Sequence, residues 1–134
     1  MEDVLAVYSR SYDKEYPVIC MDEKPVQLFA NARKSLRSKD GRIEYEDNEY
    51  IRNGTACIFL FTEPLGGWRY ADAQEYRTRT DWARPIKWLL DEQYPDVKII
   101  VLVMDNLNTH TIAALYQMFP PQEAFRIASR LEIH

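Results

Sequence analysis

Two short, continuous apolar runs stand out along the chain, and each is followed directly by an aspartate. The first covers residues 17–21 and precedes Asp22, and the second covers residues 97–104 and precedes Asp105. Runs rich in β-branched and large apolar residues are typical of strands that are buried on both faces of a sheet. Sites in such sheets form beyond the carboxyl ends of the strands. The pattern therefore predicts two buried strands, with a carboxylate at the functional end of each.

The remaining pattern predicts a β-hairpin and four helices. Apolar residues recur at helical spacing in four segments, and one helical face is expected to carry Ile112, Leu115, Tyr116 and Phe119. No period is sustained between residues 31 and 53, which predicts a long loop or irregular hairpin, with a turn at Asn53-Gly54. The expected elements, in order, are helix 2–9, strand 17–22, strand 55–62, turn 64–67, strand 68–73, helix 82–93 capped by Asp81, strand 97–104, helix 112–119, helix 124–130 and the beginning of a strand at 131–134.

Composition narrows the class of protein. A chain of 134 residues with 46% hydrophobic residues fits one globular domain, residues 1–134. No stretch reaches the ~20 apolar residues of a membrane helix, and the acidic start is unlike a signal peptide. Cys20 and Cys57 lie in apolar runs and are interpreted as buried free thiols rather than a disulfide. These features predict a cytoplasmic protein that has no membrane partner.

Charge is distributed unevenly along the chain. The net charge of −4 argues mildly against a stand-alone nucleic-acid binder, which is usually basic. Basic residues nevertheless cluster in residues 33–42 and 69–84, with an acidic segment at 44–49 between them. Each cluster fits either a solvated surface or a phosphate contact. A metal-dependent nucleic-acid enzyme can combine an acidic site with basic rims, so net charge does not exclude that class.

Carboxylates that converge at strand ends suit a particular chemistry. Hard divalent cations prefer oxygen ligands. Two Mg²⁺ or Mn²⁺ ions held ~3.5–4 Å apart can clamp the attacking and leaving oxygens of a phosphodiester, and such a site usually uses three or more carboxylates. Asp22 and Asp105 are therefore candidate metal ligands and catalytic residues.

Four segments of the sequence together resemble a known family. They are Cys20-Met21-Asp22-Glu23-Lys24-Pro25, Tyr50-Ile51-Arg52-Asn53-Gly54-Thr55, Asp81-Trp82-Ala83, and Val103-Met104-Asp105-Asn106-Leu107-Asn108-Thr109-His110. In this order, the chain resembles the catalytic domain of DDE-type transposases, in the bacterial insertion-sequence branch related to the mariner-like elements. The resemblance extends over effectively the whole chain.

The resemblance implies an α/β fold, a ribonuclease H-like mixed sheet with flanking helices. It also implies metal-dependent DNA cleavage and strand transfer at transposon ends, with Asp22 as the first catalytic acid and Asp105 as the second. The family's third acid, a glutamate, lies on a helix beyond the last strand, and Glu132 comes too early for that role. The family's upstream helix-turn-helix region has no counterpart either. We therefore expect a partial domain whose C-terminal part is missing, from a fragment or a truncated gene copy, with impaired activity.

Further residues are candidate DNA contacts, each with a structural alternative. Lys24 fits a phosphate contact or an exposed flanking charge. Asn108 fits a residue that orients Asp105 or a helix cap, and His110 fits an approach to the scissile phosphate or a helix-start surface position. The candidate DNA-backbone contacts among the arginines are Arg52, Arg69, Arg77 and Arg79.

Three other interpretations remain beside an active core. The chain fits a non-catalytic dimerising remnant or regulatory module, because it lacks the third acid. The missing helix should also leave apolar sheet surface exposed, and we expect a homodimer or higher assembly to cover it. A haloacid dehalogenase-type phosphatase would need a second aspartate two positions after Asp22, where this chain has Lys24. A nucleotide-binding α/β protein would need a glycine-rich phosphate loop after one of the strands, and neither strand has one.

Overall fold

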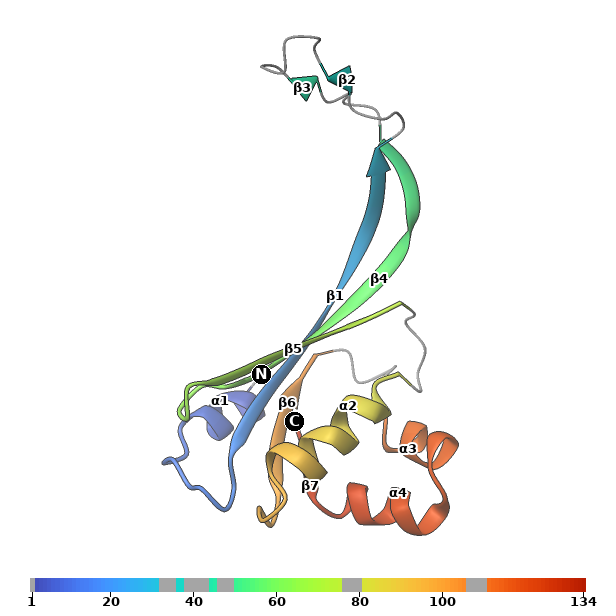
Figure 1. Ribbon diagram of the computed structural model, residues 1–134. Coiled ribbons are helices and arrows are strands. Elements are labelled where there is room, and N and C mark those ends of the chain that lie inside the picture. Colours follow the sequence, from blue (N-terminus) through green and yellow to red (C-terminus); the bar gives the residue numbers. More distant parts are fainter. Residues whose placement is uncertain (1, 32–35, 38–43, 46–49, 76–80, 106–110) are drawn as a thin grey trace.

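A mixed sheet of five strands forms the centre of the molecule, and Figure 1 shows its arrangement in the computed structural model. The strand order is β5-β4-β1-β6-β7. β4 pairs antiparallel with both β1 and β5, whereas β6 runs parallel to β1 and β7 runs parallel to β6. This is the mixed sheet expected from the sequence. The strands are β1 Val18–Asn31, β4 Tyr50–Glu63, β5 Trp68–Gln74, β6 Ile100–Met104 and β7 Leu131–Ile133.

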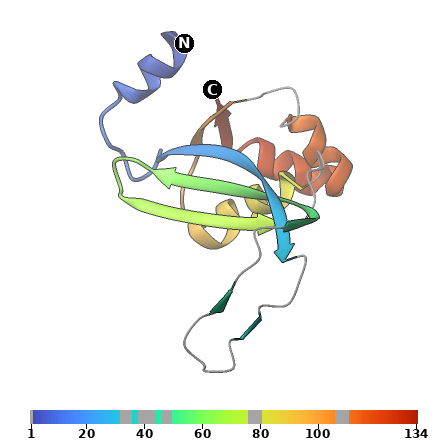
Figure 2. The ribbon, with the colours of Figure 1, turned by 90° about the horizontal axis from the view of Figure 1, so that it is seen from above.

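Helices cover both faces of this sheet, as Figures 1 and 2 show. α1 (Glu2–Tyr8) lies on one face, which we call the α1 face. The opposite face, called the helical face, carries the other helices and the larger core. The helical elements there are α2 Ala83–Trp88, the π-helical turn η1 Leu89–Gln93 that continues it, α3 Ile112–Met118 and α4 Pro121–Ala128.

Outside the main sheet, the structure describes one further pair of strands. A separate two-stranded pair, β2 (Leu36–Arg37) with β3 (Glu44–Tyr45), lies in the segment expected to form a loop or irregular hairpin. None of the described helices is long and apolar enough to cross a membrane. The described residues are 2–31, 36–37, 44–45, 50–75, 81–105 and 111–134.

The main core lies between the sheet and the helical face. Trp82, Ile86 and Leu89 are completely buried, which confirms the expected face of the helix that follows residue 81. The expected face of α3 was wrong in part, because Ile112 and Tyr116 are 44% and 45% exposed. The buried positions are Ala114 and Leu115, with Met118 and Phe119 packed beside them, so the helical period is right but the face is rotated.

β1 and β4 continue far past the body of the sheet as a two-stranded ribbon, visible in Figure 1. The expectation that the first strand ends at residue 22 was therefore wrong. β6 pairs with β1 only from Val18 to Met21, and beyond that point no strand among the described residues pairs with the outer edge of β1. A proline costs little where no neighbouring strand needs its amide. Pro25 is therefore tolerated inside the strand.

The expected turn at Asn53-Gly54 is instead a bulge within β4. The pairing shifts there, because Gln27 is opposite Thr55 whereas Phe29 is opposite Arg52. Gly54 adopts φ +98°, and the Gln27 side-chain amide donates to its carbonyl over 2.6 Å. A bulge with glycine in this region inserts one extra residue without ending the strand. The local sequence signal for a turn was therefore real, but pairing with β1 overrides it.

Two other boundaries differ from expectation. β6 begins at Ile100 rather than at residue 97, because the strands that pair with it begin only at Val18 and Leu131. Asp81 is not the capping residue of the next helix. The cap position is Trp82, which makes no side-chain capping hydrogen bond.

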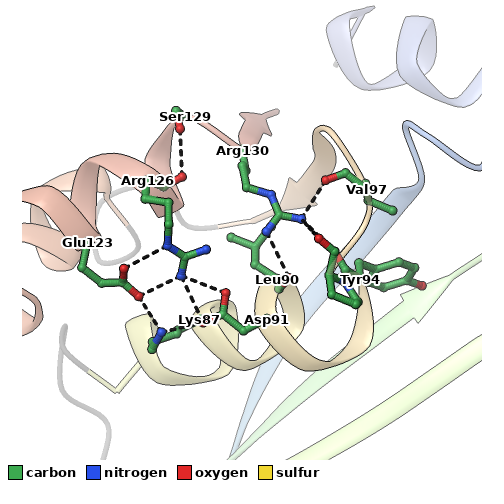
Figure 3. Close-up of polar contacts among 10 residues, drawn as sticks. Lys87, Leu90, Asp91, Tyr94, Val97, Glu123, Arg126, Ser129 and Arg130 are labelled. Atoms are coloured by element: carbon green, nitrogen blue, oxygen red, sulfur yellow. Dashed lines mark hydrogen bonds and ion pairs between the residues drawn. The ribbon is translucent and has the colours of Figure 1, made fainter.

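Ion pairs of Arg126 on α4 and hydrogen bonds of Arg130, which follows α4, connect that helix to α2 and η1, as Figure 3 shows. Arg126 contacts both Asp91 and Glu123, and Lys87 bridges the same two carboxylates. Arg130 donates to four backbone carbonyls where η1 ends, at distances of 2.7–3.2 Å from the acceptors on Leu90, Tyr94, Pro95 and Val97. These bonds satisfy carbonyls that a helix end leaves without intrahelical partners.

Candidate functional site

The two candidate acids occupy matching positions on neighbouring parallel strands. Met21 of β1 pairs with Met104 of β6, and this is the last pair of the parallel ladder. Asp22 and Asp105 are the next residue of each chain segment. Adjacent strands lie about 4.8 Å apart. The backbone therefore places the two aspartates side by side where β6 ends, with Asp22 inside β1 just past its parallel pairing with β6.

Strand alternation assigns both aspartates to the α1 face. Ile19 and Met21 of β1 belong to the core on the helical face, whereas Cys20 packs with the small cluster under α1. Successive side chains point to opposite faces of a sheet, so Asp22 shares the face of Cys20. On β6, Val103 belongs to the α1 cluster, and Asp105 continues the same alternation. Both aspartates are solvent-exposed.

The Asp22 carboxylate is oriented by the backbone. The amide of Glu23 donates to Asp22 Oδ1 over 2.8 Å. A backbone donor restricts the rotamer of the carboxylate while leaving its second oxygen available to another ligand. Directly opposite Asp22 on β4 stands Leu60, which pairs in turn with Ala71 of β5.

The surface around Asp22 combines an apolar area with two basic residues, Lys24 and Arg69. Leu60 is 43% exposed, and a shallow hollow of ≈590 Å³ lies over β4 and β5 beside it. Sequence reasoning missed Leu60 as a neighbour of the site. The signal was present in the alternation of residues 56–61, where Cys57 and Phe59 face the core and Leu60 faces the other way.

The structure places three of the proposed DNA-contacting residues. Lys24 is exposed two positions after Asp22 on the same strand face, and Arg69 is exposed on β5 opposite Thr62. Thr62 pairs with Cys20, so Arg69 also lies on the α1 face. Arg52 lies elsewhere, on the ribbon opposite Phe29, which at ~3.3 Å per residue is about 23 Å along β1 from Asp22. Arg77, Arg79, Asn108 and His110 lie outside the described residues.

α1 borders this site where it packs over β1 and β6. Its one fully buried residue, Val7, packs on Val101 and Val103 of β6. The Tyr8 hydroxyl and Cys20 Sγ are 3.2 Å apart, and this hydrogen bond is the main cause that raises the pKa of Tyr8. Both thiols are free, as expected, although Cys20 is only half-buried.

Ion pairs hold the ends of α1 against β7. Arg10 pairs with Glu132 over 2.8 Å, and His134 Nδ1 lies 2.6 Å from the Asp3 carboxylate. The second ring nitrogen of His134 lies 2.8 Å from Glu132. Glu132 lies within β7, in agreement with its exclusion as the third acid.

The donor set fits a divalent cation in kind but is small in number. Two carboxylates side by side supply the hard oxygen ligands that Mg²⁺ and Mn²⁺ prefer. Within the ranges that the structure describes, however, no three His, Cys, Asp or Glu side chains form a group that could hold a metal ion. Asp22 and Asp105 alone would therefore bind such an ion weakly.

The family follows from a match that covers most of the chain. The model of the DDE superfamily endonuclease family matches residues 17–134. The chain belongs to the DDE superfamily endonucleases. No functionally curated protein matches it.

Solved structures show the same fold for this DDE superfamily domain. The crystal structure of the Mos1 strand transfer complex superposes with a TM-score of 0.54 at 15% identity, covering 98% of this chain. A pre-cleavage Mos1 transpososome gives a TM-score of 0.51 at 14% identity over 98% of the chain. The expected ribonuclease H-like fold is thus confirmed. The chain spans 38% and 39% of the lengths of these two Mos1 chains.

Proposed function

We propose that this domain contributes Asp22 and Asp105 as metal-binding carboxylates to a transposase catalytic core that cleaves and joins DNA at transposon ends. The observation that supports this proposal is the parallel pairing of β1 with β6, which ends with Met21 opposite Met104. It makes two acids that are 83 residues apart, from position 22 to position 105, into spatial neighbours. Membership of the DDE superfamily endonucleases supports the same chemistry.

Each part of the site has a role in this proposal. A bound Mg²⁺ or Mn²⁺ would stabilise the charge that develops on phosphate oxygens during cleavage. Asp22 and Asp105 would hold the ion through carboxylate oxygens, with Asp22 oriented by the Glu23 amide. Lys24 and Arg69, on the same sheet face, would contact DNA phosphates and set the path of the backbone. In this proposal the protein works in the cytoplasm.

Calorimetric titration with Mn²⁺ tests the proposal. We expect weak binding by the native chain and a loss of at least about tenfold in affinity in Asp22→Asn and in Asp105→Asn, because each variant removes one charged oxygen ligand. Asp96→Asn is the matched control, since Asp96 is exposed beyond η1 and carries the same charge. Equal affinity in all four proteins would refute the shared site.

We also propose a homodimer, in which a second copy covers apolar surface on the α1 face. Exposed Leu60 and the hollow beside it support this, because large apolar patches rarely stay bare on a soluble monomer. On the same face, the ribbon adds exposed Leu28 and Ile51. This surface would also serve the alternative function, that of a dimerising module without nuclease activity. Retained assembly in the metal-site variants would separate the two roles.

A further inference from the structure

A pocket of ≈430 Å³ lies on the helical face of the sheet, between the edge strand β5 and the beginning of α2. It is therefore on the opposite face from Asp22 and is independent of the proposed metal site. Strand alternation directs Tyr70, Asp72 and Gln74 to this face, where α2 covers the sheet. Its lining includes Tyr70, Asp72, Glu75, Asp81, Arg84 and Trp88.

One wall of the pocket is aromatic. The rings of Tyr70 and Trp88 stack with centroids 4.2 Å apart and planes inclined by 23°. Trp68 extends the stack, with its ring nearly parallel to that of Tyr70 at 6.1 Å. Tyr70 and Trp88 are only half-buried, so part of the stack borders the pocket. An aromatic surface of this kind attracts a cation, and a planar guanidinium stacks on it best.

The pocket is also acidic. Among the residues that the structure describes, three carboxylates line it, those of Asp72, Glu75 and Asp81, together with the guanidinium of Arg84. The Gln74 side-chain amide donates to Asp72 Oδ2 over 2.8 Å, which fixes this carboxylate inside the pocket. Carboxylates next to an aromatic wall favour a positively charged ligand and disfavour a phosphate or a nucleic acid.

The strand beside the pocket is available for pairing. β5 is the last strand of the sheet order, and no described strand pairs with its outer edge. Its outward positions on the α1 face are Arg69, Ala71 and Ala73, so the edge has neither the proline nor the row of charges that usually blocks strand addition. An extended peptide can add to such an edge through main-chain hydrogen bonds and place alternate side chains in neighbouring pockets.

We propose that β5 and this pocket bind an extended protein segment that carries an arginine. The segment adds as a sixth strand beside β5. Its arginine enters the pocket, where the guanidinium stacks on the Tyr70–Trp88 pair and donates to Asp72. The partner is thus a basic, extended peptide, and it docks on the face opposite the metal site.

The test uses the full chain and a blocked peptide, acetyl-Thr-Val-Thr-Arg-Thr-Val-Thr-amide, titrated by NMR. The same peptide with citrulline in place of arginine keeps the shape but removes the charge. We expect the arginine peptide to bind about tenfold more tightly, because it alone makes charged hydrogen bonds to the pocket. The amide signals that shift should be those of β5, together with the indole NH of Trp88.

Paired variants separate this pocket from general charge attraction. Asp72→Asn keeps the size of the side chain and an oxygen for the Gln74 bond, and it should weaken arginine-peptide binding about tenfold. Asp96→Asn, with the same change in net charge, should leave binding unchanged. The proposal is overturned if the two peptides bind equally, if the two variants weaken binding equally, or if the shifts map away from β5. None of these outcomes depends on metal binding at Asp22 and Asp105.

Discussion

At the scale of single residues, Glu63 at the end of β4 is a charged residue buried in the described part of the chain. Its side chain is buried at 7% exposure and accepts a 2.7 Å hydrogen bond from the Tyr94 hydroxyl. Burial, and then this bond to Glu63, raises the pKa of Tyr94. The turn after β4 closes directly over the carboxylate, and a Cβ added at Gly66 would overlap it.

Gly66→Ala is therefore expected to destabilise the fold. The Glu63 carboxylate cannot move aside without losing its bond to Tyr94, so the overlap should lower the free energy of unfolding by about 1–3 kcal/mol. Chemical denaturation monitored by tryptophan fluorescence measures this. Leu65→Ala, in the same turn at an exposed position, is the control and should change stability little. A Gly66→Ala variant as stable as the native chain would show that Glu63 is free to move.

At the scale of elements, the docking of α1 depends on charge as well as on packing. Only Val7 is fully buried from this helix, and the ion pairs at its ends, whose side chains are partly exposed, add a modest contribution to its attachment. Hydrogen bonds to Asp3, and then to Glu132, raise the pKa of His134 above 6.5. A group whose pKa is raised by folding stabilises the folded state most below its unfolded value. The contribution of His134 is lost as pH rises through the raised pKa.

We expect α1 to loosen from the sheet on the alkaline side of that transition. The charges that face His134 are Asp3 from α1 and Glu132 from β7, with Arg10 on the far side of Glu132. The methyl NMR signals of Val7 report its packing, and they should shift with pH in the native chain but not in His134→Gln. High salt should weaken the effect, because Asp3 is 68% exposed. Identical pH profiles in the two proteins would contradict this role of His134.

Local sequence patterns predicted the elements well where a strand or helix has its own buried face. The helix that contains Trp82 and Ile86 is an example, since both are buried as the period indicated. Patterns failed where a distant partner decides the structure. Pro25 and Gly54 are local breakers, yet both lie within strands because β1 and β4 pair along the ribbon. The parallel neighbourhood of the two strand segments that precede Asp22 and Asp105 was predictable because each is a short apolar run with its own buried face.

At the scale of the whole molecule, the sheet is covered unequally. The helical face carries the main core, whereas α1 covers only the β6 side of the other face and leaves Leu60 exposed. We expect the native chain to be a dimer by light scattering and Leu60→Lys to be a monomer, because a buried unpaired charge is costly at an interface. Leu65→Lys, on the exposed turn, should remain a dimer. A native monomer that binds no apolar dye would exclude this interface.

Paramagnetic NMR with Mn²⁺ tests most directly whether Asp22 and Asp105 bind one shared ion, since a bound ion broadens the signals of nearby amides only. If Asp22 and Asp105 share one ion, low concentrations of Mn²⁺ should broaden the amides of Glu23 and Asp105 together. Both effects should vanish in Asp22→Asn and persist in Asp96→Asn. Broadening of only one of these two amides, or broadening of both that persists in Asp22→Asn, would contradict a shared metal site.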